Sequence, residues 1–401
     1  MGLDQRTPLK MMLTGNYAAA YGAKLARAEA VPVYPITPQT TVMEKIIELI
    51  KRKEMEAEYI PLESEHSVMA AAIAAEATGV RVFTASSSQG IAYMHENLFA
   101  ASGLRLPIVM ALANRCITPP ISIYPDHSDS LAQRDTGWIQ FYAENAQEII
   151  DTVIQSYRVA EHREVLLPVA VCYEGLIVSH FLEPVEIPDQ RMVDQFLPPY
   201  EPDHVLLHPR RVMHLSVYVN DQYFMEYKYQ QQEAMENAKR IIKQVDQEFG
   251  EKFGRNYGAL VQPYRMEDAK VAILAMGSNC GLARTAVDDL RKEGIALGSL
   301  KLRVFRPFPE EEIRAMTKNL NLLIVLDRDV SIGMGGIVYS EVAGSLFPME
   351  SKPLLVNYIV GLGGRIMTLH DLKGLINDAI TYAQEGRIDR PVRWVGVRGV
   401  E

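Results

Sequence analysis

Residues 31–42 read VPVYPITPQTTV, a stretch in which an expected strand gives way to an expected helix. An apolar run, expected as a buried strand over 30–36, ends at two prolines that bracket Thr37. Apolar residues at helical spacing follow over 40–53. Each proline fixes its own φ and restricts the residue before it, so the Thr37 hydroxyl is expected to have one position. That position suits either a ligand contact or a helix cap, for which Thr40 is a second candidate.

The alternation of short apolar runs with amphipathic segments continues and predicts a parallel sheet covered on both faces. It fades from about 183 to 222, where proline-rich segments indicate a linker or surface arm, and a long charged helix is expected over 224–250. Alternation resumes at 269. We therefore predict an α/β fold in three parts, which are a doubly wound parallel-sheet domain over 1–182, an arm with a long helix over 183–265, and a smaller α/β domain over 266–401.

Composition narrows the class of protein. A chain of 401 residues is too long for one ordinary core, which agrees with two domains. The net charge of -9 argues against nucleic-acid binding, which relies on basic patches. No apolar stretch approaches the about 20 residues needed to cross a bilayer. No export signal is visible at the amino terminus, so the cytoplasm is the expected location.

The metal-binding residue types are sparse. The three cysteines, Cys116, Cys172 and Cys280, lie far apart, and no CxxC spacing occurs. The nine histidines show no HExxH spacing. The chain alone is therefore not expected to hold an iron–sulfur cluster, a structural zinc or another metal ion.

Four strand-to-helix junctions are expected to meet at one edge of the first sheet. In open α/β sheets, ligands bind beyond the carboxyl ends of the strands. The junctions carry Thr37, Glu65 in LESEHSV, the small-residue run TASSSQG (84–90), and Arg115 after ALAN. Because arginine binds carboxylates bidentately, Thr37 with Arg115 would form a clamp for a small 2-oxo acid. The other interpretation makes Arg115 a member of a surface or interdomain ion pair, and the remaining groups helix caps.

A set of motifs in a fixed order then becomes specific. These are VYPITPQTT, LESEHSV, FTASSSQG, ALANR, QRDTGWIQFYAE, VFRPFP and GLGGR. From about residue 10 to residue 385, their order and spacing resemble the alpha subunit of 2-oxoacid:ferredoxin oxidoreductases. The resemblance implies a pyrimidine-binding-type domain of a thiamine diphosphate (TPP) enzyme, followed by a domain like the carboxy-terminal domain of transketolase.

The resemblance also implies roles for individual residues. Glu65 matches the glutamate that hydrogen-bonds the TPP aminopyrimidine and favours its imino tautomer. Thr37 matches the substrate-contacting threonine, and Arg115 the arginine that binds the substrate carboxylate. A threonine in place of a basic residue argues for a monocarboxylic 2-oxo acid. Ser88, Gln89 and Gly90 would shape the cofactor edge. Glu65 could instead cap the helix expected over 64–79.

The long loop after Arg115 is a candidate for part of the substrate pocket. Within 121–138, Tyr124, His127 and Asp129 are candidates for side-chain selectivity, because loops of this length often carry function. For His127, a structural or solvated role is favoured over proton transfer.

Two absences imply partners under the same resemblance. The chain has no GDG followed by a distant asparagine, the usual signature of the diphosphate and Mg²⁺ side, and no ferredoxin-type cysteine run. A beta subunit would then bind the TPP diphosphate and Mg²⁺. Subunits of gamma and delta type would supply coenzyme A and 4Fe–4S cluster roles, with ferredoxin as the electron acceptor.

The activity expected from this resemblance is the oxidative decarboxylation of a 2-oxo acid with coenzyme A, with pyruvate as the default substrate. The alternatives are a bulkier acid, 2-oxoisovalerate or phenylglyoxylate, and a non-catalytic scaffold whose motifs serve packing only.

Overall fold

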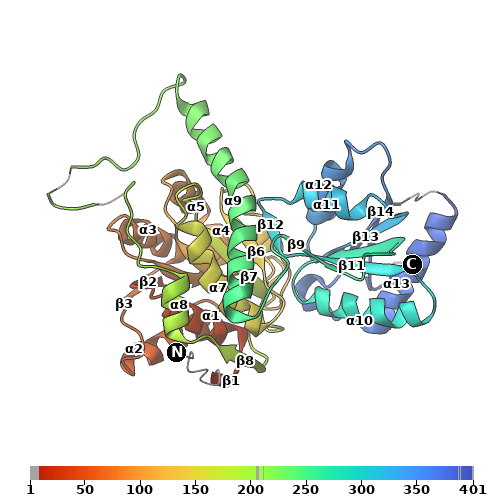
Figure 1. Ribbon diagram of the computed structural model, residues 1–401, viewed down its shortest axis with the longest axis horizontal. Helices are drawn as coiled ribbons and strands as arrows, with labels where there is room; N and C mark the ends of the chain where they lie inside the picture. The colour runs from red at the N-terminus through yellow and green to blue at the C-terminus, as the bar shows by residue number, and fades with distance from the viewer. Residues whose placement is uncertain (1–8, 205–206, 211, 387, 389, 400–401) are drawn as a thin grey trace.

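A computed structural model describes residues 9–204, 207–210, 212–386, 388 and 390–399. Figure 1 shows two α/β units side by side, with the amino-terminal one on the left and the carboxy-terminal one on the right. They meet near strands β9 (Val261–Tyr264) and β12 (Val304–Arg306). An α/β fold with parallel sheets is confirmed. The expected limits at 182/183 and 265/266 stay a prediction.

The first sheet is largely parallel. Its hydrogen-bonded order is β12-β6-β7-β5-β4, in which only β12 runs antiparallel, and a parallel pair β2-β3 is tied to β4 by a bridge from Ala30 to Val82. The carboxyl ends of the parallel strands therefore open on one edge. The strand bounds are Ala30–Val33 for β2, Glu58–Pro61 for β3, Phe83–Ser86 for β4, Val109–Asn114 for β5, Ile139–Tyr142 for β6 and Val169–Glu174 for β7.

Side-chain caps define where several helices of this unit begin. The Ser64 hydroxyl accepts from the Ser67 N–H at the start of α3. The Asn145 side-chain oxygen Oδ1 accepts from the Glu148 N–H at the start of α7. Such caps satisfy N–H groups that have no partner within the helix. The helices are α1 (Gly15–Leu25), α2 (Thr40–Lys51), α3 (Glu65–Glu76), α4 (Ser88–Tyr93), α5 (His95–Gly103), α6 (Ser128–Leu131) and α7 (Ala146–Ala160).

The segment in which sequence periodicity fades is partly regular. Strand β8 (Glu183–Ile187) pairs antiparallel with β1 (Leu9–Leu13), and the short helix α8 (Gln190–Phe196) follows. Buried Val185 and Phe196 hold these elements on the body, which the proline-rich sequence did not reveal. The long helix is confirmed as α9 (Phe224–Phe253). Its first turns project from the body, and its second half buries apolar residues against α7.

The second sheet has the order β15-β14-β13-β10-β11-β9, with β9 antiparallel to its neighbour and the others parallel. Helices α10 and α13 pack on one face, and α11 and α12 on the other. The remaining bounds are β10 (Val271–Ala275), α10 (Asn279–Lys292), β11 (Leu297–Leu302), α11 (Glu310–Thr317), β13 (Leu322–Asp327), α12 (Ile337–Leu346), β14 (Leu354–Ile359), a 3₁₀ turn η1 (Leu362–Gly364), α13 (Leu369–Gln384) and β15 (Val392–Trp394).

The two units share a strand. The chain leaves β11 in the second sheet, passes Arg303, and adds β12 to the edge of the first sheet beside β6. The VFRPFP motif thereby meets the QRDTGW motif, since Arg306 Nε donates to the Arg134 carbonyl at 3.2 Å. Within the described residues, no helix has the length and apolar character needed to span a membrane. No group of three or more His, Cys, Asp or Glu there could hold a metal ion.

Candidate active site

The four junctions singled out in the sequence lie at the carboxyl ends of adjacent strands. The order β5-β4-β2-β3 places Arg115, the turn 87–90, the turn 34–39 and Glu65 along one edge. All four strands are parallel, so these residues lie on the same side of the sheet. The arrangement that the spacing predicted is therefore present.

Arg115 and Thr37 are in direct contact. Arg115 Nη1 donates to the Thr37 carbonyl at 3.0 Å, and Arg115 Nε donates to the Ser122 carbonyl at 2.8 Å. The arginine is only 9% exposed, yet none of the described carboxylates forms an ion pair with it. Two backbone carbonyls thus orient a guanidinium whose charge is left for another group. The alternative of a protein ion pair at Arg115 is not supported by these contacts.

The threonine side chain is not used as a cap. Thr37 is exposed, and α2 begins after Gln39 without a side-chain capping hydrogen bond. Asn16 supports the turn instead, because its Nδ2 donates to the Pro38 carbonyl at 2.7 Å. The Tyr173 hydroxyl in turn donates to Asn16 Oδ1 at 2.9 Å. The turn is therefore held from below while the Thr37 hydroxyl stays accessible.

Glu65 is a largely buried residue whose carboxyl forms no hydrogen bond or ion pair with the residues that the structure describes. It is the first residue of α3 and is 8% exposed. Ser64, and not Glu65, supplies the side-chain cap. A Cβ added to Gly90 would lie 2.7 Å from Glu65 Oε1 and 2.5 Å from Ser86 Oγ. Only glycine at position 90 lets the turn after β4 approach Glu65 this closely.

The turn after β4 is joined to the loop after β5. Ser88 has a left-handed backbone with φ of +49°, and its hydroxyl donates to the Cys116 carbonyl at 2.7 Å. Gln89 Nε2 donates to Thr118 Oγ1 at 2.7 Å. These contacts connect the Glu65 side of the edge with the Arg115 side.

Asp129 fixes this connection. Its Oδ2 accepts from the Ser88 and Arg115 N–H groups, each at 2.9 Å, and its Oδ1 accepts from Asn114 Nδ2 at 2.7 Å and the Ser130 N–H at 2.8 Å. Burial raises the pKa of this carboxyl to about 7, although these donors act in the opposite direction. An asparagine would turn its amide hydrogens toward two of the donors. Through these contacts Asp129 joins the turn after β4 to the loop after β5, and its expected role in substrate selectivity stays a prediction.

The comparisons with known proteins agree with this geometry. Residues 21–247, more than half of the chain, match a family described as pyruvate flavodoxin/ferredoxin oxidoreductase, thiamine diphosphate-binding. Residues 269–372 match the pyruvate:ferredoxin oxidoreductase core domain II. This chain belongs to the 2-oxoacid:ferredoxin oxidoreductase family.

Similar members of this family cover the chain almost completely. Pyruvate synthase subunit PorA of Methanocaldococcus jannaschii is 48% identical over 390 residues, which are 96% of this chain and 98% of that protein. The PorA subunit of Pyrococcus abyssi is 44% identical over 391 residues, 98% of this chain and 99% of that protein. Ketoisovalerate oxidoreductase subunit VorA of Pyrococcus horikoshii is 46% identical over 387 residues, 96% of this chain and 98% of that protein.

A solved structure shares the fold. The 2-oxoglutarate:ferredoxin oxidoreductase of Magnetococcus marinus, solved with 2-oxoglutarate, coenzyme A and succinyl-CoA bound, superimposes with a TM-score of 0.71 at 18% identity. The match covers 92% of this chain and 65% of that chain. At this identity the likeness concerns the fold of the oxidoreductase family alone.

The residues of the edge fit one half of a TPP site. A buried carboxyl with no protein partner, next to a glycine turn, is what an aminopyrimidine ring nitrogen needs from the protein. The family model that matches this part of the chain is described as thiamine diphosphate-binding.

Tyr124 and His127, the other pocket candidates, lie against the second domain of the oxidoreductase chain. The exposed Tyr124 packs on Gly364. His127 is 1% exposed, and its Nε2 lies 3.2 Å from Glu174 Oε1. Glu174 also accepts from the Ser278 N–H at 3.0 Å and from Arg328 Nη1 at 3.4 Å. His127 is therefore held between the two domains, and its role in selectivity stays a prediction.

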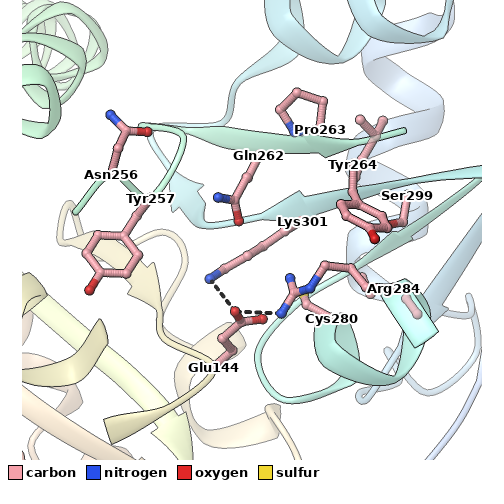
Figure 2. Close-up of a pocket in the computed structure, with 13 residues that line it drawn as sticks. Glu144, Asn256, Tyr257, Gln262, Pro263, Tyr264, Cys280, Arg284, Ser299 and Lys301 are labelled. Atoms are coloured by element: carbon pink, nitrogen blue, oxygen red, sulfur yellow. Dashed lines mark hydrogen bonds and ion pairs between the residues drawn. The ribbon is translucent and has the colours of Figure 1, made fainter. Parts of the chain in front are cut away.

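A second polar region lies further along the same edge, at the end of β6. Here Glu144 and Glu148 face Lys301 across the boundary between the sheets, with Lys301 Nζ at 2.5 Å from Glu148 Oε2 and 3.7 Å from Glu144 Oε1. Figure 2 shows Lys301 and Arg284 pointing toward Glu144 beside a cavity of about 250 Å³. Arg284 Nη2 lies 2.8 Å from Glu144 Oε1.

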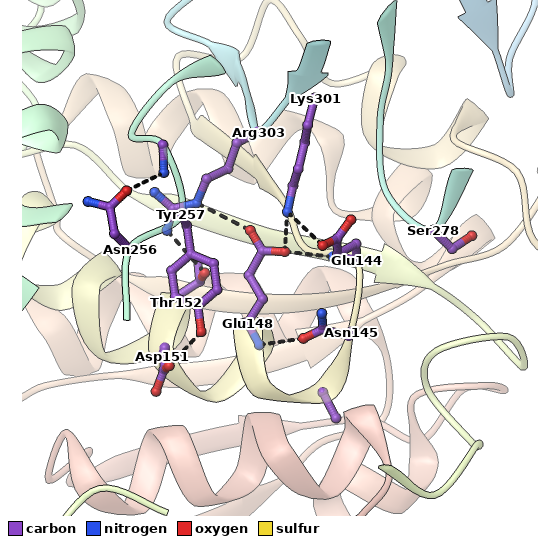
Figure 3. A network of polar contacts seen from close by, with 12 residues as sticks. Glu144, Asn145, Glu148, Asp151, Thr152, Asn256, Tyr257, Ser278, Lys301 and Arg303 are labelled. Atoms are coloured by element: carbon purple, nitrogen blue, oxygen red, sulfur yellow. Dashed lines mark hydrogen bonds and ion pairs between the residues drawn. The ribbon is translucent and has the colours of Figure 1, made fainter. Parts of the chain in front are cut away.

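Figure 3 extends this region inward. Arg303, which is fully buried, lies 3.3 Å from Glu148 Oε1 through Nε and 3.3 Å from Asp246 Oδ1 through Nη1. We name Glu144, Glu148, Asp246, Lys301 and Arg303 the interdomain ion cluster. Each member has an oppositely charged partner, so the cluster is a structural contact between the two units.

Sequence reasoning missed Asn16, Tyr173 and the joining role of Asp129. Asn16 appears in the sequence as an ordinary polar residue early in a helix, and Tyr173 as part of an apolar strand. Asp129 could be found in the sequence, because it lies in the long loop after Arg115. Its partners in other segments decide what it does.

Proposed function

We propose that this chain is the alpha subunit of a TPP-dependent 2-oxoacid:ferredoxin oxidoreductase and supplies half of its active site. The reaction converts a 2-oxo acid, coenzyme A and two oxidised ferredoxins into an acyl-CoA, CO₂, two reduced ferredoxins and one proton. The observation that carries the proposal is the Arg115 guanidinium, which is held against Thr37 and has no ion-pair partner among the described residues. It lies on the same edge as Glu65, whose carboxyl has no partner in that part of the chain either.

Arg115 is the carboxylate-binding group. Its Nε and Nη1 are occupied by carbonyls of the protein, and its Nη2 donates to none of the described residues. A carboxylate bound there would exchange water for a charge-assisted hydrogen bond in a poorly hydrated site, where such bonds are strongest. The neighbouring Thr37 hydroxyl would hydrogen-bond an oxygen of the same substrate. Together these groups orient a small 2-oxo acid by its carboxylate end.

Glu65 is the group that faces the cofactor ring. When bound, TPP supplies a thiazolium that accepts the electron pair released by decarboxylation. Glu65 would hold one proton between its carboxyl and the aminopyrimidine ring nitrogen. Gly90 approaches the carboxyl closely on one side, since a Cβ there would lie 2.7 Å from Glu65 Oε1. Ser88 and Gln89 hold that turn in place through the loop after β5.

The remaining chemistry belongs to partner chains. We propose a beta subunit that binds the TPP diphosphate through Mg²⁺, subunits of gamma and delta type with coenzyme A and 4Fe–4S cluster roles, and ferredoxin as the electron acceptor. A cytoplasmic location fits the proposal.

Pyruvate is the proposed substrate. Two of the cited relatives are named pyruvate synthase subunits, at 44% and 48% identity. A ketoisovalerate oxidoreductase subunit is 46% identical, and this similarity favours 2-oxoisovalerate as the second candidate. A substrate panel of pyruvate, 2-oxoisovalerate and phenylglyoxylate on the intact complex decides between them by kcat/KM.

The test of the proposal compares two neighbouring glutamates. In the intact complex, Glu65→Gln should lower kcat by roughly 10²–10⁴-fold, the range for loss of a proton-transfer group. Glu63→Gln is the matched control, because Glu63 is exposed and bonds only to Ser67 among the described residues. Full activity of Glu65→Gln would rule out the proposed role. If added TPP does not quench the protein fluorescence of the wild-type complex, the result would indicate that the chain is a scaffold subunit.

A further inference from the structure

A glycine turn of the second domain contacts the loop that carries Arg115. The turn follows β14 and comprises Gly361–Gly364. The Gly364 N–H donates to the Pro125 carbonyl at 2.8 Å. A Cβ at Gly364 would lie 2.6 Å from the Tyr124 Cβ and 3.1 Å from its Cγ. The turn can approach the loop this closely only because position 364 has no side chain.

A second contact lies a few residues further along the loop. The His127 N–H donates to the Arg328 carbonyl at 2.9 Å, just after β13. Arg328 Nη2 in turn donates to Asn279 Oδ1 at 3.0 Å, and a Cβ at Gly361 would lie 2.9 Å from Arg328 Nε. The glycine turn and the Arg328 segment therefore form one surface against the loop.

Hydrogen bonds within the loop carry these contacts to Arg115. The Tyr124 N–H donates to Ser122 Oγ at 3.2 Å, and the Tyr124 carbonyl accepts from the Cys116 N–H at 3.2 Å. The Ser122 carbonyl accepts from Arg115 Nε at 2.8 Å. A shift of Tyr124 would therefore move the Cys116 N–H, which is next to Arg115 in the chain, and the Ser122 carbonyl, which accepts from the Arg115 guanidinium.

Apolar packing does little to hold this loop. Ile121 is 84% exposed and Tyr124 is 53% exposed. Local stability depends on buried contacts, so a segment with few of them is held by its hydrogen bonds. The contacts from the second domain therefore restrain the outer part of the loop together with the hydrogen bonds inside it.

We propose that the Gly361–Gly364 turn is a clamp by which the second domain positions Arg115 for the substrate carboxylate. Gly364 is a positioning residue, since it acts through Tyr124, Pro125 and Ser122. The inference rests on the proposed function, because it assigns Arg115 to the 2-oxo acid. It gives the second domain a role in substrate affinity, in addition to its role in packing.

Two glycines of the turn form a matched pair for the test. Gly364 and Gly363 have φ of +76° and +57°, so alanine at either position carries a left-handed backbone. No atom lies within 4 Å of a Cβ at Gly363, whereas one at Gly364 meets Tyr124. The backbone strain is common to both variants, and only Gly364→Ala displaces the loop.

The experiment uses the complete complex and two readouts. Gly364→Ala should raise KM for the 2-oxo acid roughly tenfold, within the range for a misplaced binding group, and leave KM for coenzyme A unchanged. Hydrogen–deuterium exchange of residues 115–127 should become faster. Gly363→Ala should leave both the KM for the 2-oxo acid and this exchange as in the wild type. Equal behaviour of the two alanine variants would overturn the clamp.

A second substitution removes the group that the alanine would strike. In a Tyr124→Gly background, adding Gly364→Ala should raise KM no further than Gly363→Ala does, because contacting residues couple and separated ones add. Additive effects would overturn the proposal. If the complex does not assemble with Gly364→Ala alone, recovery of assembly in the Tyr124→Gly/Gly364→Ala variant supports the contact. Hydrogen–deuterium exchange of residues 115–127 in the Tyr124→Gly variant then tests whether the contact positions the loop. A wild-type complex inactive toward every 2-oxo acid would refute the proposed function, and the exchange measurement would still test the clamp.

Discussion

Two regions at the same edge of the first sheet treat charge in opposite ways. At the ends of β6 and β7, the interdomain ion cluster and Glu174 bring every charged side chain within reach of an opposite charge. At the ends of β5 and β3, Arg115 and Glu65 are 9% and 8% exposed and have no ionic partner among the described residues. The second domain covers the first region, and it contacts the second one through the loop that follows Arg115.

The difference shows which part of the edge is structural. A buried charge is costly unless it is paired and hydrogen-bonded, so a stable chain pairs its charges wherever no ligand is expected. Unpaired buried charges persist where a bound molecule completes them. We infer that the second domain closes the edge at β6 and β7, and that a cofactor, a substrate and a partner subunit close it from β5 to β3.

The largest expected effect is a loss of stability when the interdomain ion cluster loses one carboxylate. Glu148→Ala leaves Lys301 and Arg303 without their shared carboxylate, and should lower the free energy of unfolding by about 3–5 kcal/mol. Denaturant unfolding measures this loss. Glu54→Ala, which removes an exposed pair with Lys24, is the control and should cost at most about 1 kcal/mol. Similar losses in both variants would mean that the cluster contributes no more than a surface pair.

Removing the unpaired guanidinium should have the opposite profile. Arg115→Ala is expected to lower kcat/KM for the 2-oxo acid by an amount on the order of 2–5 kcal/mol of transition-state binding. Stability should change far less than in Glu148→Ala, because no protein carboxylate loses a partner. Steady-state kinetics and thermal unfolding of the complex measure the two quantities. Arg52→Ala, which alters an exposed pair with Glu48, should leave both nearly unchanged.

The pH dependence of stability tests Glu174. Burial acts to raise the pKa of Glu174. Hydrogen bonding from His127 and the charge of Arg328 outweigh burial and lower this pKa from 4.5 to about 2. A carboxyl with a lowered folded-state pKa stabilises the fold above about pH 4.5, and this contribution is lost as the pH falls toward 2. The full contribution is about 3 kcal/mol. Glu174→Gln should therefore show a shallower loss of stability between pH 5 and 3, and an unchanged slope would contradict the pairing.

The smallest expected effect is a change in KM when the Thr37 hydroxyl is removed. Thr37→Val should raise KM for the 2-oxo acid severalfold, equivalent to about 1 kcal/mol for one hydrogen bond. Arg115 contacts the Thr37 carbonyl and not its hydroxyl, so the arginine keeps its position in this variant. TPP binding should remain as in the wild type. Unchanged kinetics would remove the Thr37 hydroxyl from the site.

Local patterns in the sequence accounted for most of the elements. The strand over 30–36, the helix over 64–79 that begins after a serine, and the long helix over 224–250 all have counterparts, because periodicity and capping are local properties. The convergence of Thr37, Glu65 and Arg115 on one edge followed from the parallel sheet. Each of these predictions required information from only one segment at a time.

Contacts between distant segments could not be predicted in the same way. Strand β12 has three residues and follows β11 almost directly, so nothing in its sequence indicates that it joins the other sheet. Strand β8 depends on β1, which lies far away in the chain. Asp129 looked like a pocket residue because its donors, such as Ser88, come from other elements. Physical pairing, and not composition, decides these cases.

The exchange of β12 between the sheets limits how this subunit can be divided. A fragment ending before residue 304 would leave β6 with a row of unpaired backbone N–H and C=O groups, which is a template for aggregation. Conversely, a fragment starting at residue 266 would carry a short strand with no sheet to join. Neither half is a free-standing module, so recombination between homologous subunits should keep residues 139–142 and 304–306 from the same parent.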